Sequence, residues 1–230
     1  MSAREPTVLL FDVDGTLLTC GGAGRRAMEA AFRETVGRDD VCGFSFAGHT
    51  DRAIAREGLV AAGQEPDDAA IDAFLACYLR HLPDALSRAE AYAVLGGVVQ
   101  LLDALEGRER VAIGLGTGNV EPGARAKLRR GALEHRFAFG GFGSDHEERP
   151  RLIAAGAARG AARLGEPVER CRVVVIGDTP RDVAAALAIG AECVAVATGG
   201  PDAEALRDAG AHAVFDALDE PGVRAALGLG

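Results

Sequence analysis

Five polar residues of this chain, four of them acids, stand directly after runs of apolar residues. They are Asp12, Asp14, Thr117, Asp178 and Asp182. Four carboxylates that gather at one place repel one another unless a hard cation lies among them. A site made of oxygen atoms suits Mg²⁺, so these residues could hold this metal if the fold brings them together.

The apolar runs before these residues are typical of strands that are buried on both faces. Such runs occur at residues 7–11, 111–115, 173–176, 193–197 and, more weakly, 213–215, with 137–139 as a further candidate. Helical periods lie between the runs, for example at 98–105. Strands that alternate with helices predict an α/β fold with a parallel sheet. Ligands of such sheets bind beyond the carboxyl ends of the strands, where all five polar residues are expected.

One interval, residues 19–92, interrupts this alternation because it contains no convincing strand. It carries helical stripes instead, the clearest of which is Ile71, Phe74, Leu75, Tyr78 and Leu82. Glycine pairs at 21–22 and 96–97 permit bends at both ends of the interval. We therefore expect a catalytic α/β core of residues 1–18 and 93–230, with residues 19–92 inserted after the first strand as a helical domain.

Composition and charge exclude several classes of function. The net charge of −9 disfavours nucleic acid as a partner. The five cysteines are odd in number and widely spaced, which indicates free thiols in a reducing compartment. The start of the chain lacks the apolar region of a signal peptide, and no apolar run is long enough to cross a bilayer. We expect a cytoplasmic monomer or homodimer without a nucleic-acid or membrane partner.

Three motifs, in their order and each after its strand, resemble those of the haloacid-dehalogenase superfamily. DVDGT at 12–16 is similar to the first motif, TGN at 117–119 to the second, and GDTPRD at 177–182 to the fourth. The resemblance spans essentially the whole chain. It implies a Rossmann-like parallel sheet with helices on both faces and an inserted all-helical cap domain. It also implies Mg²⁺ as cofactor and a small phosphorylated metabolite as substrate, as in the phosphoglycolate-phosphatase-like branch.

The resemblance also implies a role for each motif residue. Asp12 would attack phosphorus and form an aspartyl phosphate that water then hydrolyses. Asp14 would protonate the leaving alcohol and later deprotonate the water. Mg²⁺ would be held by Asp12, the backbone carbonyl of Asp14 and Asp178. Thr117 and the backbone N–H of Gly118 would bind the phosphoryl oxygens.

Some of these residues have structural interpretations that stay open. Asp182 would orient the metal or the cation of the third motif, but Thr179 before it is a good N-cap, which makes Asp182 a capping residue as well. Thr117 could cap the following helix. Residues 49–51 could reach the site from the helical insert, although a threonine such as Thr50 is more often simply an N-cap.

The third motif departs from the family pattern. Its usual lysine, at the start of the helix after the third strand, is matched here by Arg149. Arginine keeps the charge but presents a planar fork, so we expect Arg149 to bind phosphate, with Arg151 as a weaker candidate and a surface position as the alternative. Lys127, the only lysine of the chain, stands among alanines and arginines in the middle of a helix and is expected to be exposed to solvent.

Asp14 separates the phosphatases of the superfamily from its dehalogenases, and the insert has no lysine for phosphonate hydrolysis through a Schiff base. The sequence therefore predicts Mg²⁺-dependent hydrolysis of a small phosphate monoester. Two alternatives stay open. One is a β-phosphoglucomutase-like phosphotransferase, which shares the core residues. The other is a catalytically degenerate binding protein of the same fold, which only the arginine at position 149 supports.

Overall fold

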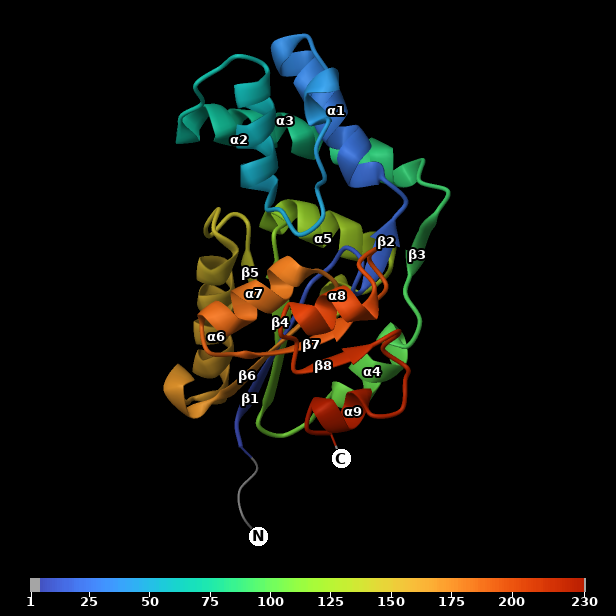
Figure 1. Cartoon of the computed structure of the whole chain (residues 1–230), viewed down its shortest axis with the longest axis vertical. Helices are drawn as coiled ribbons and strands as arrows, with labels where there is room; N and C mark the ends of the chain where they lie inside the picture. Colours follow the sequence, from blue (N-terminus) through green and yellow to red (C-terminus); the bar gives the residue numbers. More distant parts are fainter. Residues whose placement is uncertain (1–4, 230) are drawn as a thin grey trace.

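A six-stranded parallel sheet forms the centre of the computed structural model, which describes residues 5–229 (Figure 1). Residues 1–4 and 230 of the predicted core lie outside the described residues. In spatial order the strands are β5 (Gly140–Phe142), β4 (Val111–Thr117), β1 (Thr7–Phe11), β6 (Arg172–Gly177), β7 (Glu192–Val196) and β8 (Ala213–Phe215). This arrangement confirms the predicted α/β class with a parallel sheet.

Helices cover both faces of the sheet because the central strands are apolar on both sides. Along β1, Val8 and Leu10 pack into one core cluster, whereas Leu9 and Phe11 pack into the other. The helices of the Val8 face are α6 (Arg149–Leu164), α7 (Pro180–Ala188) and α8 (Ala203–Asp208). Those of the Phe11 face are α4 (Val98–Leu105), α5 (Glu121–Arg130) and α9 (Val223–Ala226). Short 3₁₀ turns occupy Asp40–Cys42, Glu134–Arg136 and Val168–Arg170.

Three further helices stand above the carboxyl ends of the strands (Figure 1). These are α1 (Ala23–Val36), α2 (Asp51–Ala61) and α3 (Asp68–Ser87), which we call the helical unit. Thr50 and Asp67 cap α2 and α3 through their side chains, as the N-cap interpretation of Thr50 predicts. The rings of Phe32 and Phe74, 4.1 Å apart, join α1 to α3.

The chain enters and leaves the helical unit through a two-stranded antiparallel ribbon. Its strands are β2 (Leu18–Cys20) and β3 (Tyr92–Val94). The sequence pattern indicates no strand between 19 and 92, yet both ends of that interval belong to this ribbon. Strands of three residues are too short to show a period, which is why the pattern does not reveal them.

The candidate strand at 137–139 is wrong, because the strand here is β5, three residues later. Phe137 is buried instead, with its ring edge-on to that of Phe11. Two of the three β5 residues are glycines, since a Cβ on Gly141 would lie 1.8 Å from the carbonyl oxygen of Leu152 in α6. Close packing by a helix therefore selects glycine here over the apolar residues that mark the other strands.

Among residues 5–229, no helix is both long enough and apolar enough to cross a bilayer.

Candidate active site

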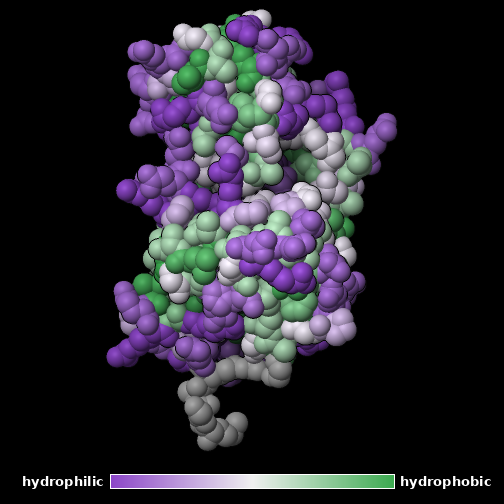
Figure 2. Space-filling model, in the orientation of Figure 1, coloured by the Kyte–Doolittle hydropathy of each residue, from purple (hydrophilic) through white to green (hydrophobic). Residues whose placement is uncertain are grey.

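A cavity of about 330 Å³ lies between the carboxyl ends of β1, β4 and β6 and the helical unit. The molecular surface is hollowed between these two parts (Figure 2). The core contributes the predicted site residues Asp12, Asp14, Thr117, Gly118, Arg149 and Asp178 to the lining. Met28, Ile54 and Tyr78 line it from the helical unit. The structure thus gathers residues that lie more than 150 positions apart in the chain.

Asp12 follows β1 directly, and its side chain is buried at the floor of the cavity. A guanidinium nitrogen of Arg149, Nη2, lies 3.2 Å from its Oδ2 atom. Burial raises the pKa of Asp12 from 3.8 to about 6, although the charge of Arg149 acts in the opposite direction. At neutral pH this carboxylate is therefore ionised but poorly solvated, as a nucleophile requires.

Asp178 is held by a hydroxyl and enclosed by two glycines. Thr16 Oγ1 donates a hydrogen bond of 2.8 Å to its Oδ1. A Cβ on Gly15 would lie 2.3 Å from the Oδ2 of Asp178, and one on Gly199 would lie 1.6 Å from it. Burial, followed by the charge of Asp12, raises the pKa of Asp178 to about 9.

The donor set at this point fits a divalent metal. Carboxylate oxygens of Asp12, Asp178 and Asp182 lie within 4.8 Å of one another, all of them buried. Both oxygens of Asp182 already accept hydrogen bonds, one from Arg149 and the other from Thr179. Asp12 and Asp178 are therefore the carboxylates that could hold Mg²⁺, whose charge would relieve the crowding that raises their pKa values.

Arg149 is buried, so the surface interpretation of this residue is wrong. Its Nη2 bonds to Asp182 Oδ1 at 2.5 Å as well as to Asp12, and its Nη1 donates to the carbonyl oxygen of Gly48 at 3.2 Å. Arg151 is exposed and pairs with Glu148. Asp182 forms the capping box of α7 and also fixes Arg149. Both interpretations of this residue, as a cap and as a partner of the cation, therefore agree with the structure.

Lys127 is also buried, so the expected exposure of this residue is wrong. Its Nζ donates to Asp14 Oδ2 at 2.5 Å and to Asn119 Oδ1 at 2.6 Å. Asn119 Nδ2 in turn donates to Asp14 Oδ2 at 2.8 Å and to Thr117 Oγ1 at 2.9 Å. Burial would raise the pKa of Asp14, but the charge and the hydrogen bond of Lys127 lower it below 3.8.

The position of Lys127 on α5 explains why it is buried. The buried residues of this helix are Gly123, Ala124, Lys127 and Leu128, a stripe at i, i+1, i+4 and i+5. Lysine falls on the same stripe as the small and apolar residues, and it is the only lysine in a chain that otherwise uses arginine. These two signals together could have identified it.

The start of α2 reaches the loop after β4, as one of the two interpretations of residues 49–51 predicts. Asp51 Oδ2 accepts a hydrogen bond of 2.9 Å from Val120 N, and Asp51 N donates one of 2.8 Å to Gly118 O. A Cβ on Gly118 would lie 2.5 Å from the carbonyl oxygen of His49, so glycine permits this contact. Burial raises the pKa of Asp51 from 3.8 to about 6, against the charge of Lys127.

Comparisons with known proteins agree with this geometry. The model of a family described as haloacid dehalogenase-like hydrolase matches residues 6–190. The phosphoglycolate phosphatase of Rhodospirillum rubrum is 32% identical over 223 residues, which cover 92% of this chain and 87% of that protein.

Two solved structures show the same fold. CbbY from Rhodobacter sphaeroides, in complex with phosphate, superposes with a TM-score of 0.72 at 21% identity, over 98% of this chain and 100% of that one. A predicted phosphoglycolate phosphatase from Haemophilus somnus has a TM-score of 0.68 at 14% identity, over 98% of each chain. The family match and the curated relative show that the chain belongs to the haloacid dehalogenase-like hydrolase family and is a phosphatase.

Proposed function

We propose that this enzyme hydrolyses a small phosphate monoester in the presence of Mg²⁺, through an aspartyl phosphate formed on Asp12. The observation that carries the proposal is the setting of the Asp12 carboxylate. It is buried at the carboxyl end of β1, faces a cavity of about 330 Å³ and is flanked by a buried arginine. A carboxylate in this position can attack a phosphoryl group while Arg149 balances the negative charge that the two bring together.

The bond changes fall on residues of this chain. A bond forms between an oxygen of Asp12 and phosphorus as the bond from phosphorus to the ester oxygen breaks, and Asp14 gives its proton to the leaving alcohol. Water then attacks the phosphorus as the bond between phosphorus and the Asp12 oxygen breaks, Asp14 takes a proton from that water, and inorganic phosphate leaves the regenerated carboxylate. Lys127 favours the ionised form of Asp14, which the second half of the reaction needs, so the first half draws on the minor protonated form of this residue. Mg²⁺, held by Asp12, Asp178 and the backbone of Asp14, would supply positive charge to the phosphoryl oxygens.

A small anionic ester such as 2-phosphoglycolate is the substrate class that we propose. The curated relative carries the name of this activity. The cavity size admits a small metabolite, and Arg25 of the helical unit is among the residues that line the cavity. Its guanidinium is fixed by hydrogen bonds to the carbonyl oxygens of Cys42 and Phe44 and lies 3.9 Å from the ring centre of Phe46.

We further propose that residues 19–92, which contain the helical unit, form a cap domain that closes over the site. Support comes from the cavity itself, which both parts of the molecule line, and from the ribbon that joins them. A closed cap would exclude water from the phosphoryl group until the alcohol has left.

The five cysteines are unpaired, which supports a reducing compartment such as the cytoplasm.

The buried position of Arg149 beside Asp12 argues against the binding-protein alternative, which rests only on the arginine at this position. The phosphotransferase alternative shares the same residues and is separated from hydrolysis by its product. Transfer would yield a new phosphate ester, whereas hydrolysis yields inorganic phosphate.

The test measures inorganic phosphate released from p-nitrophenyl phosphate and from 2-phosphoglycolate, with Mg²⁺ and then with EDTA. We expect the wild type to turn over with Mg²⁺ and not with EDTA. We expect no turnover by Asp12→Asn, because an amide cannot attack phosphorus. The variant should retain the wild-type melting temperature to within a few degrees. Sustained turnover by Asp12→Asn, with deamidation excluded by mass spectrometry, would refute the proposed nucleophile.

A further inference from the structure

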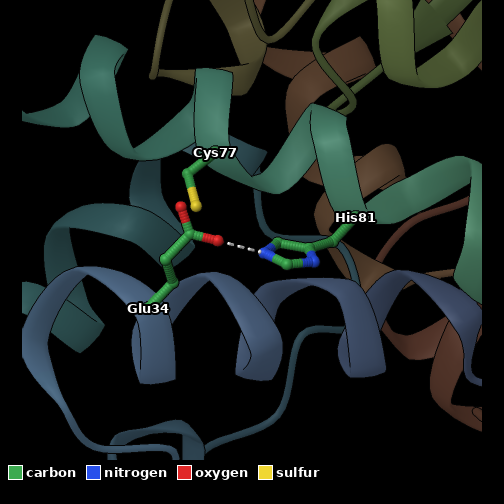
Figure 3. Close-up of side chains that lie close together, drawn as sticks. All are labelled: Glu34, Cys77 and His81. Atoms are coloured by element: carbon green, nitrogen blue, oxygen red, sulfur yellow. Dashed lines mark hydrogen bonds and ion pairs between the residues drawn. The ribbon is translucent and has the colours of Figure 1, made fainter.

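A second group of potential metal ligands lies in the helical unit, outside the cavity (Figure 3). Glu34 belongs to α1, whereas Cys77 and His81 belong to α3. One ligand atom from each of the three lies within 4.8 Å of the other two. The side chains point toward one another across the contact between the two helices (Figure 3).

The helices position this group without strain. Cys77 and His81 are four residues apart, so they occupy the same face of α3, one turn above the other. Glu34 lies two positions after Phe32, whose ring packs on that of Phe74. The pair of rings fixes the spacing of α1 and α3, and this spacing brings the carboxylate to the thiol and the imidazole.

The chemistry of the three donors selects the metal. A thiolate sulfur, an imidazole nitrogen and a carboxylate oxygen are the ligands that Zn²⁺ takes in proteins, whereas Mg²⁺ takes oxygen atoms. We propose that Glu34, Cys77 and His81 form a Zn²⁺ site that ties α1 to α3, with water as the fourth ligand. This site is separate from the Mg²⁺ site proposed at Asp12 and does not depend on the proposed function.

Solvent can reach the site from one side. The side chains of Glu34 and His81 are 48% and 34% exposed, which leaves a path for an ion, whereas Cys77 closes the inner side at 2% exposure. Binding would break the 2.8 Å hydrogen bond between His81 Nε2 and Glu34 Oε2. The thiol of Cys77 would lose its proton to solvent as the bond from sulfur to metal forms.

Arg80 competes with the metal for Glu34. Its guanidinium pairs with Glu34 Oε1, the second oxygen of the same carboxylate. A metal ion at the site would share this carboxylate with a positive charge that repels it. Removing the arginine should therefore tighten metal binding, which is a result that a simple cluster of surface ion pairs would not give.

The experiment uses the full chain, stripped of metals and then kept in excess Mg²⁺ so that oxygen sites are filled. Co²⁺ is the probe, because a thiolate bonded to Co²⁺ gives an intense charge-transfer absorption in the near ultraviolet that oxygen ligands do not give. We expect this absorption to saturate at one Co²⁺ per chain and to be abolished by Zn²⁺. Cys77→Ser and His81→Gln should remove it, whereas Cys171→Ser, the matched control at a half-buried cysteine, should retain it.

Arg80→Ala should bind Co²⁺ several-fold more tightly than the wild type does, and Glu34→Gln should bind it at least tenfold more weakly. Zn²⁺ should raise the melting temperature of the wild type but not that of Cys77→Ser. Hydrolysis of p-nitrophenyl phosphate by Cys77→Ser should equal that of the wild type, which shows that the variant folds. No thiolate absorption at millimolar Co²⁺, or an absorption that persists in Cys77→Ser, would overturn the proposal.

Discussion

Lys127→Met tests whether the buried lysine serves the reaction or only the fold. Methionine fills the space of the lysine stem but removes the two hydrogen bonds of Nζ, to Asp14 and to Asn119. A hydrogen bond that involves a charged group contributes about 1.5–3 kcal/mol. The side chain of Asp14 is 40% exposed, so water can replace part of that contribution, and we take the lower end for each bond.

Together the two bonds then amount to about 3 kcal/mol of positioning, which corresponds to roughly a 150-fold loss in kcat/KM. The free energy of unfolding should change far less, by about 1 kcal/mol, for two reasons. The variant no longer buries an ammonium group, and the carboxylate left behind can hydrate. The expected signature is a large loss of activity in a protein of nearly normal stability.

Initial rates on p-nitrophenyl phosphate at saturating Mg²⁺ measure the first quantity, and urea unfolding measures the second. Arg129→Met is the matched control, because Arg129 lies on the same helix but is 67% exposed and pairs only at the surface with Glu134. It should leave both quantities nearly unchanged. A folded Lys127→Met enzyme within twofold of the wild type would refute a catalytic role for the lysine. Losses in stability above about 4 kcal/mol would mark it as a structural residue instead.

Three further changes have defined outcomes. Burial raises the pKa of Asp51 from 3.8 to about 6, so its ionisation costs stability as pH rises through that interval. Relative to the wild type, Asp51→Asn should therefore gain about 2 kcal/mol between pH 4 and pH 7 in metal-free urea unfolding, and a gain on acidification would contradict this. Arg149→Ala should lower kcat by about 10²–10³-fold, whereas Arg151→Ala, at an exposed position, should stay within twofold in the same assay, and the reverse ranking would show that the third motif is misaligned. Gly199→Ala would place a methyl group 1.6 Å from Asp178 Oδ2, so the Mg²⁺ concentration for half-maximal activity should rise, and an unchanged value would argue against Asp178 as a ligand.

The fold and the floor of the site could be predicted from the sequence because both depend on local signals. Continuous apolar runs mark the long central strands, and parallel strands end at the same edge of the sheet. Asp12, Asp14, Thr117 and Asp178 therefore had to meet, whatever the loops between them do. Arg149 could be placed by the resemblance of its segment to the third motif, whose usual lysine it replaces.

The remaining features depend on packing partners that are distant in the chain. Lys127 is buried against a carboxylate that lies 113 residues away in the chain. The stripe of Gly123, Ala124 and Leu128 indicates that its position is buried, but not which group it meets. Asp51 meets the backbone of Val120 only because the helical unit folds down on the core. Strand β5 lacks an apolar run because the close packing of α6 requires glycines in it. A pattern of apolar residues cannot show where two backbones touch.

The ribbon of β2 and β3 has a consequence for how such an enzyme can change. Cys20 and Tyr92 are direct partners across the two strands, so the chain leaves the core and returns to it at a single point. An antiparallel pair can be closed by a turn of two residues, or by an insert of any length that begins and ends at that point. Everything between the two residues can therefore be exchanged, shortened or rebuilt without a shift in the strands that precede Asp12 and Asp178. Substrate preference can then diverge by replacement of one contiguous segment while the hydrolytic chemistry is inherited intact.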